Sequence, residues 1–306
     1  MEQDEILYEL LKQPPFRDKR FTGRLRGQVM RRAAGSRSAG RSLIVPIALT
    51  VALLAGVVAI AYAGLPVSRL DRKPAADDAV RHEYFVGEKL LFSAYPDPQL
   101  TAGEPYGYLF HFAAPFDELL GKKLSIDAVH LETGTRMRAV PAATVAEPSG
   151  GYAGLERFTA SFGLPVSGLW RYELKLDGRP YGDVVLKVED GAWTVSPTFR
   201  SGAYPLRGVE GKFGFVDPGF IAGEQQKVLW HFWGKARELE GKFEVKAVRE
   251  GNVWVVNLFA ADSLGGAANG ADRSMPSTLN LPEAGRWRLM PYVGGRMLGS
   301  VVVDAK

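Results

Sequence analysis

The residues best suited to chemistry are two histidines set among aromatic side chains. His231 stands in the stretch VLWHFWGK and His111 in the stretch YLFHFAAP. A histidine that acts as a general base or as a metal ligand needs a nucleophile, a carboxylate or further ligands beside it. The chain has no H-E-x-x-H, G-x-S-x-G, S-x-x-K, calcium-loop or P-loop motif. We therefore expect no catalytic, cofactor or metal site, and a packing role for both histidines.

His231, Trp233 and Arg288 form a candidate binding surface. In a strand with a period of two residues, Trp230 and Phe232 would face the core, which turns His231 and Trp233 to the outer face. A guanidinium at position 288 has three open roles: it can hold an anionic ligand, pair with a surface carboxylate or stack on an aromatic ring.

The two histidine stretches belong to an internal repeat. DPQLTAGEPYGYLFHF (residues 97–112) aligns with DPGFIAGEQQKVLWHF (residues 217–232) at an offset of 120. Farther along, LPVSGLWRYELKLDGRPYGDVVLKV (residues 164–188) aligns with LPEAGRWRLMPYVGGRMLGSVVVDA (residues 281–305) at an offset of 117. So many matches with so small a slip indicate a duplication.

Each half of the repeat has the pattern of short strands. Runs rich in Val, Phe, Tyr and Trp are broken by Gly, Pro and Asp, and about seven such runs in roughly 110 residues are typical of an immunoglobulin-like sandwich. We therefore predict an all-β ectodomain of two tandem immunoglobulin-like β-sandwiches, residues 84–190 and 191–306, that arose by internal duplication. The strands predicted in the second unit lie near residues 212–216, 227–233, 243–249, 253–258, 278–281, 286–293 and 297–303.

Several acidic residues fall between the predicted strands. The Asp-Pro pairs that begin at Asp97 and Asp217 are expected to form turns, because both residue types favour them. Glu104 and Glu224, which follow the paired Ala-Gly steps, are expected to be solvated turn residues. Residues 192–208 are predicted to be a short linker with some edge pairing.

Two long loops offer another recognition surface. Residues 143–154 and the glycine-rich residues 264–274, which we expect to be flexible, fall between corresponding strands of the two units. Long loops on a rigid scaffold often carry binding sites, and they are equally well explained as tolerated insertions.

A membrane span precedes the repeat. No charged residue occurs from Ser42 to Ser68, and the 21 residues from Leu43 to Ala63 are mostly apolar, which matches the ~20 residues that a helix needs to cross a bilayer. We predict a transmembrane helix at residues 42–65 and a polar stalk at residues 66–83. A cleaved signal peptide remains the alternative, because the segment ends in an A-x-A-like Ala-Tyr-Ala.

The charge distribution sets the expected topology. Residues 1–41 carry 10 basic and five acidic residues, whereas the remainder carries 28 basic and 29 acidic residues. This bias predicts a basic cytoplasmic tail at residues 1–41 and extracytoplasmic C-terminal domains. The near-neutral remainder argues against a nucleic-acid partner. The absence of cysteine excludes disulfides and thiolate chemistry.

The stretches SPTF, GKFGFV, FIAGEQQKVLWHFWGK and LEGKFEVKAV resemble a domain-of-unknown-function family of Gram-positive single-pass membrane proteins. The resemblance covers residues 196–306. It implies an immunoglobulin-like extracytoplasmic domain and supplies neither an activity nor functional residues. The tail stretch PPFRDKRFTGRL also loosely resembles cytoplasmic segments of anti-sigma factors.

We therefore expect a non-enzymatic, membrane-anchored cell-envelope protein whose tandem sandwiches bind a ligand or a protein partner outside the cell. The alternative is a transmembrane signal transducer with a sensing ectodomain and a tail that binds a cytoplasmic regulator. A hydrolase is less favoured, because no set of acid, base and nucleophile can be assembled from the motifs. The expected partners are the lipid bilayer, an extracytoplasmic protein or ligand, and a cytoplasmic protein held by the tail.

Overall fold

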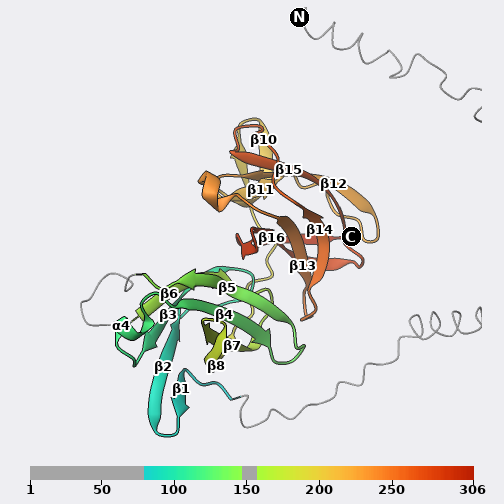
Figure 1. Ribbon diagram of the computed structural model, residues 1–306. Coiled ribbons are helices and arrows are strands. Elements are labelled where there is room, and N and C mark those ends of the chain that lie inside the picture. Colours follow the sequence, from blue (N-terminus) through green and yellow to red (C-terminus); the bar gives the residue numbers. More distant parts are fainter. Residues whose placement is uncertain (1–78, 147–156) are drawn as a thin grey trace, which may run out of the picture. The chain divides into compact units, whose positions relative to one another are not determined.

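The structure is a computed structural model that describes residues 79–146 and 157–306. The predicted tail, the predicted span, most of the predicted stalk and most of the loop at residues 143–154 lie outside these residues. In the described part, nearly all regular structure is β-strand (Figure 1). None of the helices described there is long and apolar enough to cross a membrane.

Sandwich 1 consists of strands β1 to β8 and has two four-stranded antiparallel sheets. One sheet has the order β1-β2-β3-β6 and the other the order β5-β4-β7-β8. The bounds are β1 (Glu83–Val86), β2 (Lys89–Pro96), β3 (Pro105–Phe112), β4 (Lys123–His130), β5 (Arg136–Thr144), β6 (Arg157–Gly163), β7 (Gly168–Leu176) and β8 (Arg179–Val188). A single helical turn, α4 (Phe116–Leu119), lies between β3 and β4.

Sandwich 2 consists of strands β9 to β18. One sheet has the order β15-β12-β11-β10-β9, and the other has the order β14-β13-β16-β17, with β18 also paired to β16. The bounds are β9 (Thr198–Ser201), β10 (Tyr204–Val209), β11 (Phe213–Phe215), β12 (Gln225–Phe232), β13 (Phe243–Arg249), β14 (Val256–Ala261), β15 (Arg273–Asn280), β16 (Gly285–Val293), β17 (Arg296–Met297) and β18 (Val301–Ala305), with a 3-10 turn, η2 (Ala236–Glu238), before β13.

The core of each sandwich is built from side chains at alternate positions along its strands. On β12, Val228, Trp230 and Phe232 are buried and face the core of sandwich 2, as the period of two predicts. The indole Nε1 of Trp230 donates a hydrogen bond to Ser277 Oγ at 3.1 Å, and the indole ring lies 4.7 Å from the ring of Phe215. The polar atom of this large side chain is therefore satisfied inside the core.

The two sandwiches share one strand order. The pairing β2-β3-β6 corresponds to β11-β12-β15, and β5-β4-β7-β8 corresponds to β14-β13-β16-β18. Strands β3 and β12 begin at Pro105 and Gln225, 120 residues apart, whereas β7 and β16 begin at Gly168 and Gly285, 117 residues apart. These are the two offsets at which the halves of the sequence align.

Most strands predicted in the second unit lie near observed ones. The prediction at residues 243–249 coincides with β13, whereas β14 begins three residues later than predicted. The segment predicted as a linker, residues 192–208, instead contains β9 and most of β10, which form a hairpin. Gly202, at φ +57°, begins the two-residue turn of that hairpin, so the glycine that suggested a loop serves a turn between strands.

The predicted Asp-Pro turns are present in both sandwiches. Asp97 Oδ1 accepts a hydrogen bond from the backbone N–H of Gln99 at 2.8 Å, and Asp217 Oδ1 accepts one from that of Gly219 at 2.9 Å. Each carboxylate thus stabilises its turn by bonding to the backbone N–H two residues later in the chain.

Candidate functional site

The three residues predicted to form one binding surface do not come together. His231 lies on β12 and is 1% exposed, whereas Arg288 lies on β16, in the opposite sheet of sandwich 2, and is 2% exposed. Of the three, only Trp233 is partly exposed. Neither the imidazole nor the guanidinium is therefore available at the surface to a ligand.

His231 occupies the outer face of its sheet, as predicted, but other residues cover it. The Nδ2 atom of Asn269 lies 3.1 Å from His231 Nε2, and the ring of Trp233 stacks at a centroid distance of 6.3 Å. Burial lowers the pKa of His231 below its ordinary value, although hydrogen bonding to the backbone at Leu229 and Gly214 opposes the shift. The imidazole is therefore neutral at pH 7 and serves packing.

Trp233 fastens the loop at residues 264–274. Its Nε1 donates a hydrogen bond to the carbonyl of Gly270 at 2.9 Å, and Ser274 Oγ donates one to the carbonyl of Gly266 at 2.8 Å. The loop that we predicted to be flexible is thus held against β12. Trp233, which has only an alanine as its counterpart in sandwich 1, secures a loop instead of presenting an open aromatic surface.

Arg288 lies at the junction between the two sandwiches. Its Nη2 donates a hydrogen bond to the carbonyl of Gly191 at 2.8 Å, and its Nη1 lies 3.3 Å from Asp190 Oδ1. Its guanidinium carbon lies 4.0 Å from the ring centroid of Trp193. Two of the roles left open by the sequence, ion pairing and aromatic stacking, are both present, but at a buried junction and not on the surface.

The loop before β3 completes this junction from the side of sandwich 1. Gly103 has φ +89°, and a Cβ atom there would lie only 2.5 Å from Cδ of Arg288, so no other residue fits without displacing the arginine. On the other side of the junction, Ser196 Oγ accepts a hydrogen bond from the backbone N–H of Val302 at 2.9 Å, which fastens the connecting segment to β18 of sandwich 2.

Glu104 is not the solvated turn residue that the sequence suggested. Its Oε1 accepts hydrogen bonds from the backbone N–H and the Oγ of Ser300 in sandwich 2, at 3.2 and 3.1 Å. Burial raises the pKa of Glu104, and the hydrogen bonds from Ser300 offset part of that rise. Glu224, at the equivalent place in the repeat, is exposed as predicted.

Apolar packing continues across the junction. Val248, Met290, Tyr292 and Met297 of sandwich 2 belong to the same buried cluster as the core of sandwich 1. Both sandwiches accordingly lie within one compact unit, Lys73–Lys306. The junction therefore combines buried apolar contacts with oriented polar ones, which fixes the second sandwich relative to the first.

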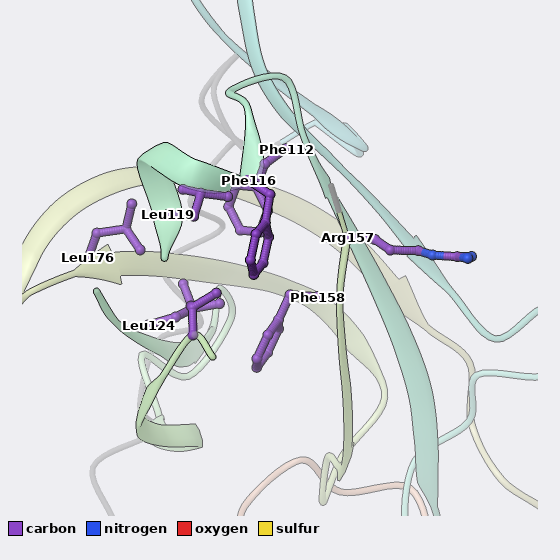
Figure 2. A pocket seen from close by; sticks show the side chains of 8 residues that line it. Phe112, Phe116, Leu119, Leu124, Arg157, Phe158 and Leu176 are labelled. Carbon is purple, nitrogen blue, oxygen red and sulfur yellow. The ribbon is translucent and has the colours of Figure 1, made fainter. Parts of the chain in front are cut away.

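A small pocket lies near α4, at the end of sandwich 1 opposite the junction. Figure 2 shows Phe112, Phe116 and Phe158 around it, with Arg157 directed away. Its volume of about 10 Å³ would hold at most about one water molecule. The pocket is therefore a packing gap and not a ligand site.

An open hollow lies on the outer face of sheet β1-β2-β3-β6. Its volume is about 300 Å³, the lower end of the range of roughly 300–1,000 Å³ for small-molecule sites. Tyr95 is 53% exposed there and stands two residues before the carboxylate of Asp97. The hollow is lined by Tyr95, Pro96, Asp97, Gly107, Tyr108, Leu109, Thr159 and Ala160. The sequence did not single out this surface, because no motif marks it.

The described residues contain no group of three or more His, Asp or Glu side chains that could hold a metal ion. The hollow itself offers an aromatic ring, a carboxylate and backbone polar groups, which suit reversible binding of a polar ligand or a protein segment.

We expect Arg288→Ala to loosen the junction. Asp190 is half-exposed and would not be left as a buried charge, so the loss in free energy of unfolding should be about 1–3 kcal/mol, from hydrogen bonds to a charged group. Urea unfolding of residues 69–306 measures this loss, and small-angle scattering should show a larger radius of gyration. The matched control is Arg171→Ala, the equivalent position of sandwich 1, where the side chain is 28% exposed and lies 3.9 Å from Asp183; loss of so long an ion pair should cost less than about 1 kcal/mol. Equal effects of the two substitutions would contradict the junction role.

Glu104 should make the stability of the protein depend on pH. Because its pKa is raised in the folded protein above the ordinary value of 4.5, its contribution to stability is full below 4.5 and is lost as pH rises through the raised value. The free energy of unfolding of the wild type, relative to Glu104→Gln, should therefore fall between pH 4.5 and neutrality. Urea titrations at a series of pH values measure the difference, with the exposed Glu224→Gln as the matched control. A flat difference for Glu104→Gln would refute this prediction.

The family match covers mainly sandwich 2. The model of a domain of unknown function (DUF4871) matches residues 181–303, which include most of the stretch 196–306 whose sequence resembles such a family. A Bacillus anthracis protein that is proposed to be a lipoprotein is 27% identical, with 38% of this chain and 88% of that chain covered and a TM-score of 0.33. The Escherichia coli adhesin FdeC is 13% identical, with 70% of this chain and 64% of that chain covered and a TM-score of 0.25. Invasin, a bacterial integrin-binding protein, is 12% identical, with 71% of this chain and 39% of that chain covered and a TM-score of 0.20. No curated protein matches the sequence.

Proposed function

We propose that this chain is a non-enzymatic cell-envelope protein, anchored by residues 42–65, whose two sandwiches bind a ligand or a protein partner outside the cell as one rigid unit. In this proposal the sandwiches are immunoglobulin-like copies that arose by duplication. Their common strand order and the offsets of 120 and 117 residues support the duplication.

The observation that carries the proposal is the buried arginine at the junction. Removing a guanidinium from water is unfavourable unless its hydrogen bonds and its charge are compensated, and Asp190, Gly191 and Trp193 supply that compensation for Arg288. Two sandwiches on a flexible linker would need no such residue. A fixed relation between them is useful to a protein that must present a surface at a set distance and angle from its anchor.

The hollow around Tyr95 is the binding surface that we assign. It is open, it carries an exposed aromatic ring, and it lies on the outer face of its sheet. Exposed tyrosines are frequent energetic centres of interfaces, because the ring gives a large contact area at little cost in conformational entropy.

A capture experiment tests the binding function. Immobilised residues 69–306 should retain an envelope component, and Tyr95→Ala should weaken that retention by about tenfold, as expected for an interface centre. Tyr204→Ala, at a tyrosine that is 44% exposed in sandwich 2, is the matched control and should change little. Capture by residues 1–41 with none by residues 69–306 would favour a signal transducer, and equal loss in the two variants would argue against the hollow.

Protease treatment of intact cells tests the topology. The extracytoplasmic part should be degraded by protease added from outside, while a tag on the N-terminal tail should stay protected until the cells are lysed. An ectodomain that resists digestion in intact cells and is digested after lysis would rule out the proposed orientation.

A further inference from the structure

Strands β1 and β2 extend past their sheet as a two-stranded ribbon. Pairing of β2 with β3 begins at Phe92, whereas Phe85 pairs with Leu90 and Val86 with Lys89. Within the described part of the chain, residues 85–90 therefore pair only with one another, and Figure 1 shows this ribbon projecting from the body of sandwich 1. A ribbon of this kind is marginally stable in water by itself.

The tip of the ribbon exposes large apolar side chains. Phe85 is 48% and Val86 is 58% exposed. Exposed in this way they contribute little to the folded core. Two adjacent, exposed apolar side chains at the tip of a projecting hairpin are suited to a contact surface.

The fold leaves this end of sandwich 1 free. The opposite end carries Gly103, Glu104 and Asp190, which contact sandwich 2. The ribbon is therefore on the side that faces away from sandwich 2.

The sequence places this free end next to the predicted anchor. Only residues 66–82 of the predicted stalk separate the predicted span from β1, so the ribbon is the first strand pair after that span. Seventeen residues reach at most about 60 Å when fully extended, which sets an upper limit on the distance between the predicted span and the ribbon.

We propose that the ribbon tip, Phe85 and Val86, inserts into the interfacial region of the bilayer that holds the chain's own anchor. This inference rests on the proposed function, because it requires the span. Glu88 and Lys89 at the turn carry opposite charges, so apolar insertion and not headgroup charge provides the attraction. Two apolar side chains suffice, because the anchor keeps the local concentration of lipid near the tip high.

The absence of cysteine makes the test direct. In the full-length chain, Val86→Cys carries the only thiol and can be labelled with a polarity-sensitive fluorophore after reconstitution into phosphatidylcholine vesicles. The label at position 86 should emit at shorter wavelength and be about fivefold less accessible to an aqueous quencher than a label at Ile221→Cys, as expected for side chains buried at the lipid interface. Ile221 is the matched control, because it is an apolar residue of sandwich 2 that is 47% exposed. Adding anionic lipid should change neither signal.

A second substitution keeps the test specific. Phe85→Ser, introduced into the Val86→Cys chain, should return the label toward the accessibility seen at position 221. Equal accessibility at positions 86 and 221 would overturn the proposal, and so would shielding that appears only when envelope proteins are added, since that result would assign the tip to a protein partner.

Extraction at alkaline pH separates this inference from the proposed function. A chain that stays in the vesicles while its label at position 86 is accessible overturns the ribbon contact alone. A chain that is released overturns the anchor and the ribbon contact together.

Discussion

The burial of one guanidinium decides how the described part of this protein is organised. Arg288 is 2% exposed, and an arginine in that position is tolerated only where its charge and its donors are met by well-placed partners. Those partners, Asp190, the carbonyl of Gly191 and the ring of Trp193, lie on the segment that leaves sandwich 1. Because these contacts are directional, they fix the course of the segment between the sandwiches, and an apolar cluster that crosses the junction packs beside them.

The two sandwiches have the same strand order, but equivalent polar residues at their ends and surfaces make different contacts. Glu104 contacts Ser300 across the junction, whereas Glu224, at the equivalent position, faces solvent. Arg288 is enclosed, whereas the side chain of Arg171 is 28% exposed and lies 3.9 Å from Asp183. The core positions are thus similar in both sandwiches, whereas equivalent polar positions outside the cores have different roles.

This difference explains how far the sequence could predict the structure. Strand β13 and the turns at Asp97 and Asp217 follow from local patterns, because alternation and turn chemistry act within a few residues. The burial of Glu104 depends on a residue 196 positions away, and no local pattern carries that information.

The candidate site was harder to predict for the same reason. His231 was correctly placed on the outer face of β12, but its cover comes from Asn269 in a loop that looked flexible. Arg288 was correctly considered for stacking, and its partner Trp193 lay in a segment interpreted as a linker. The hollow around Tyr95 depends on three strands lying side by side, so it exists only in the folded sheet.

Strand β2 connects the two surfaces that we assign to sandwich 1. It begins at Lys89, in the ribbon, and ends at Pro96, on the edge of the hollow. At ~3.4 Å per residue these points lie about 24 Å apart along one strand, and the strand is held in the sheet from Phe92 onward. A contact made by the ribbon tip would therefore set both the height and the direction of the hollow relative to the surface that the tip touches. Because the junction at the other end of sandwich 1 joins it to sandwich 2 by directional contacts, the same contact would also orient sandwich 2.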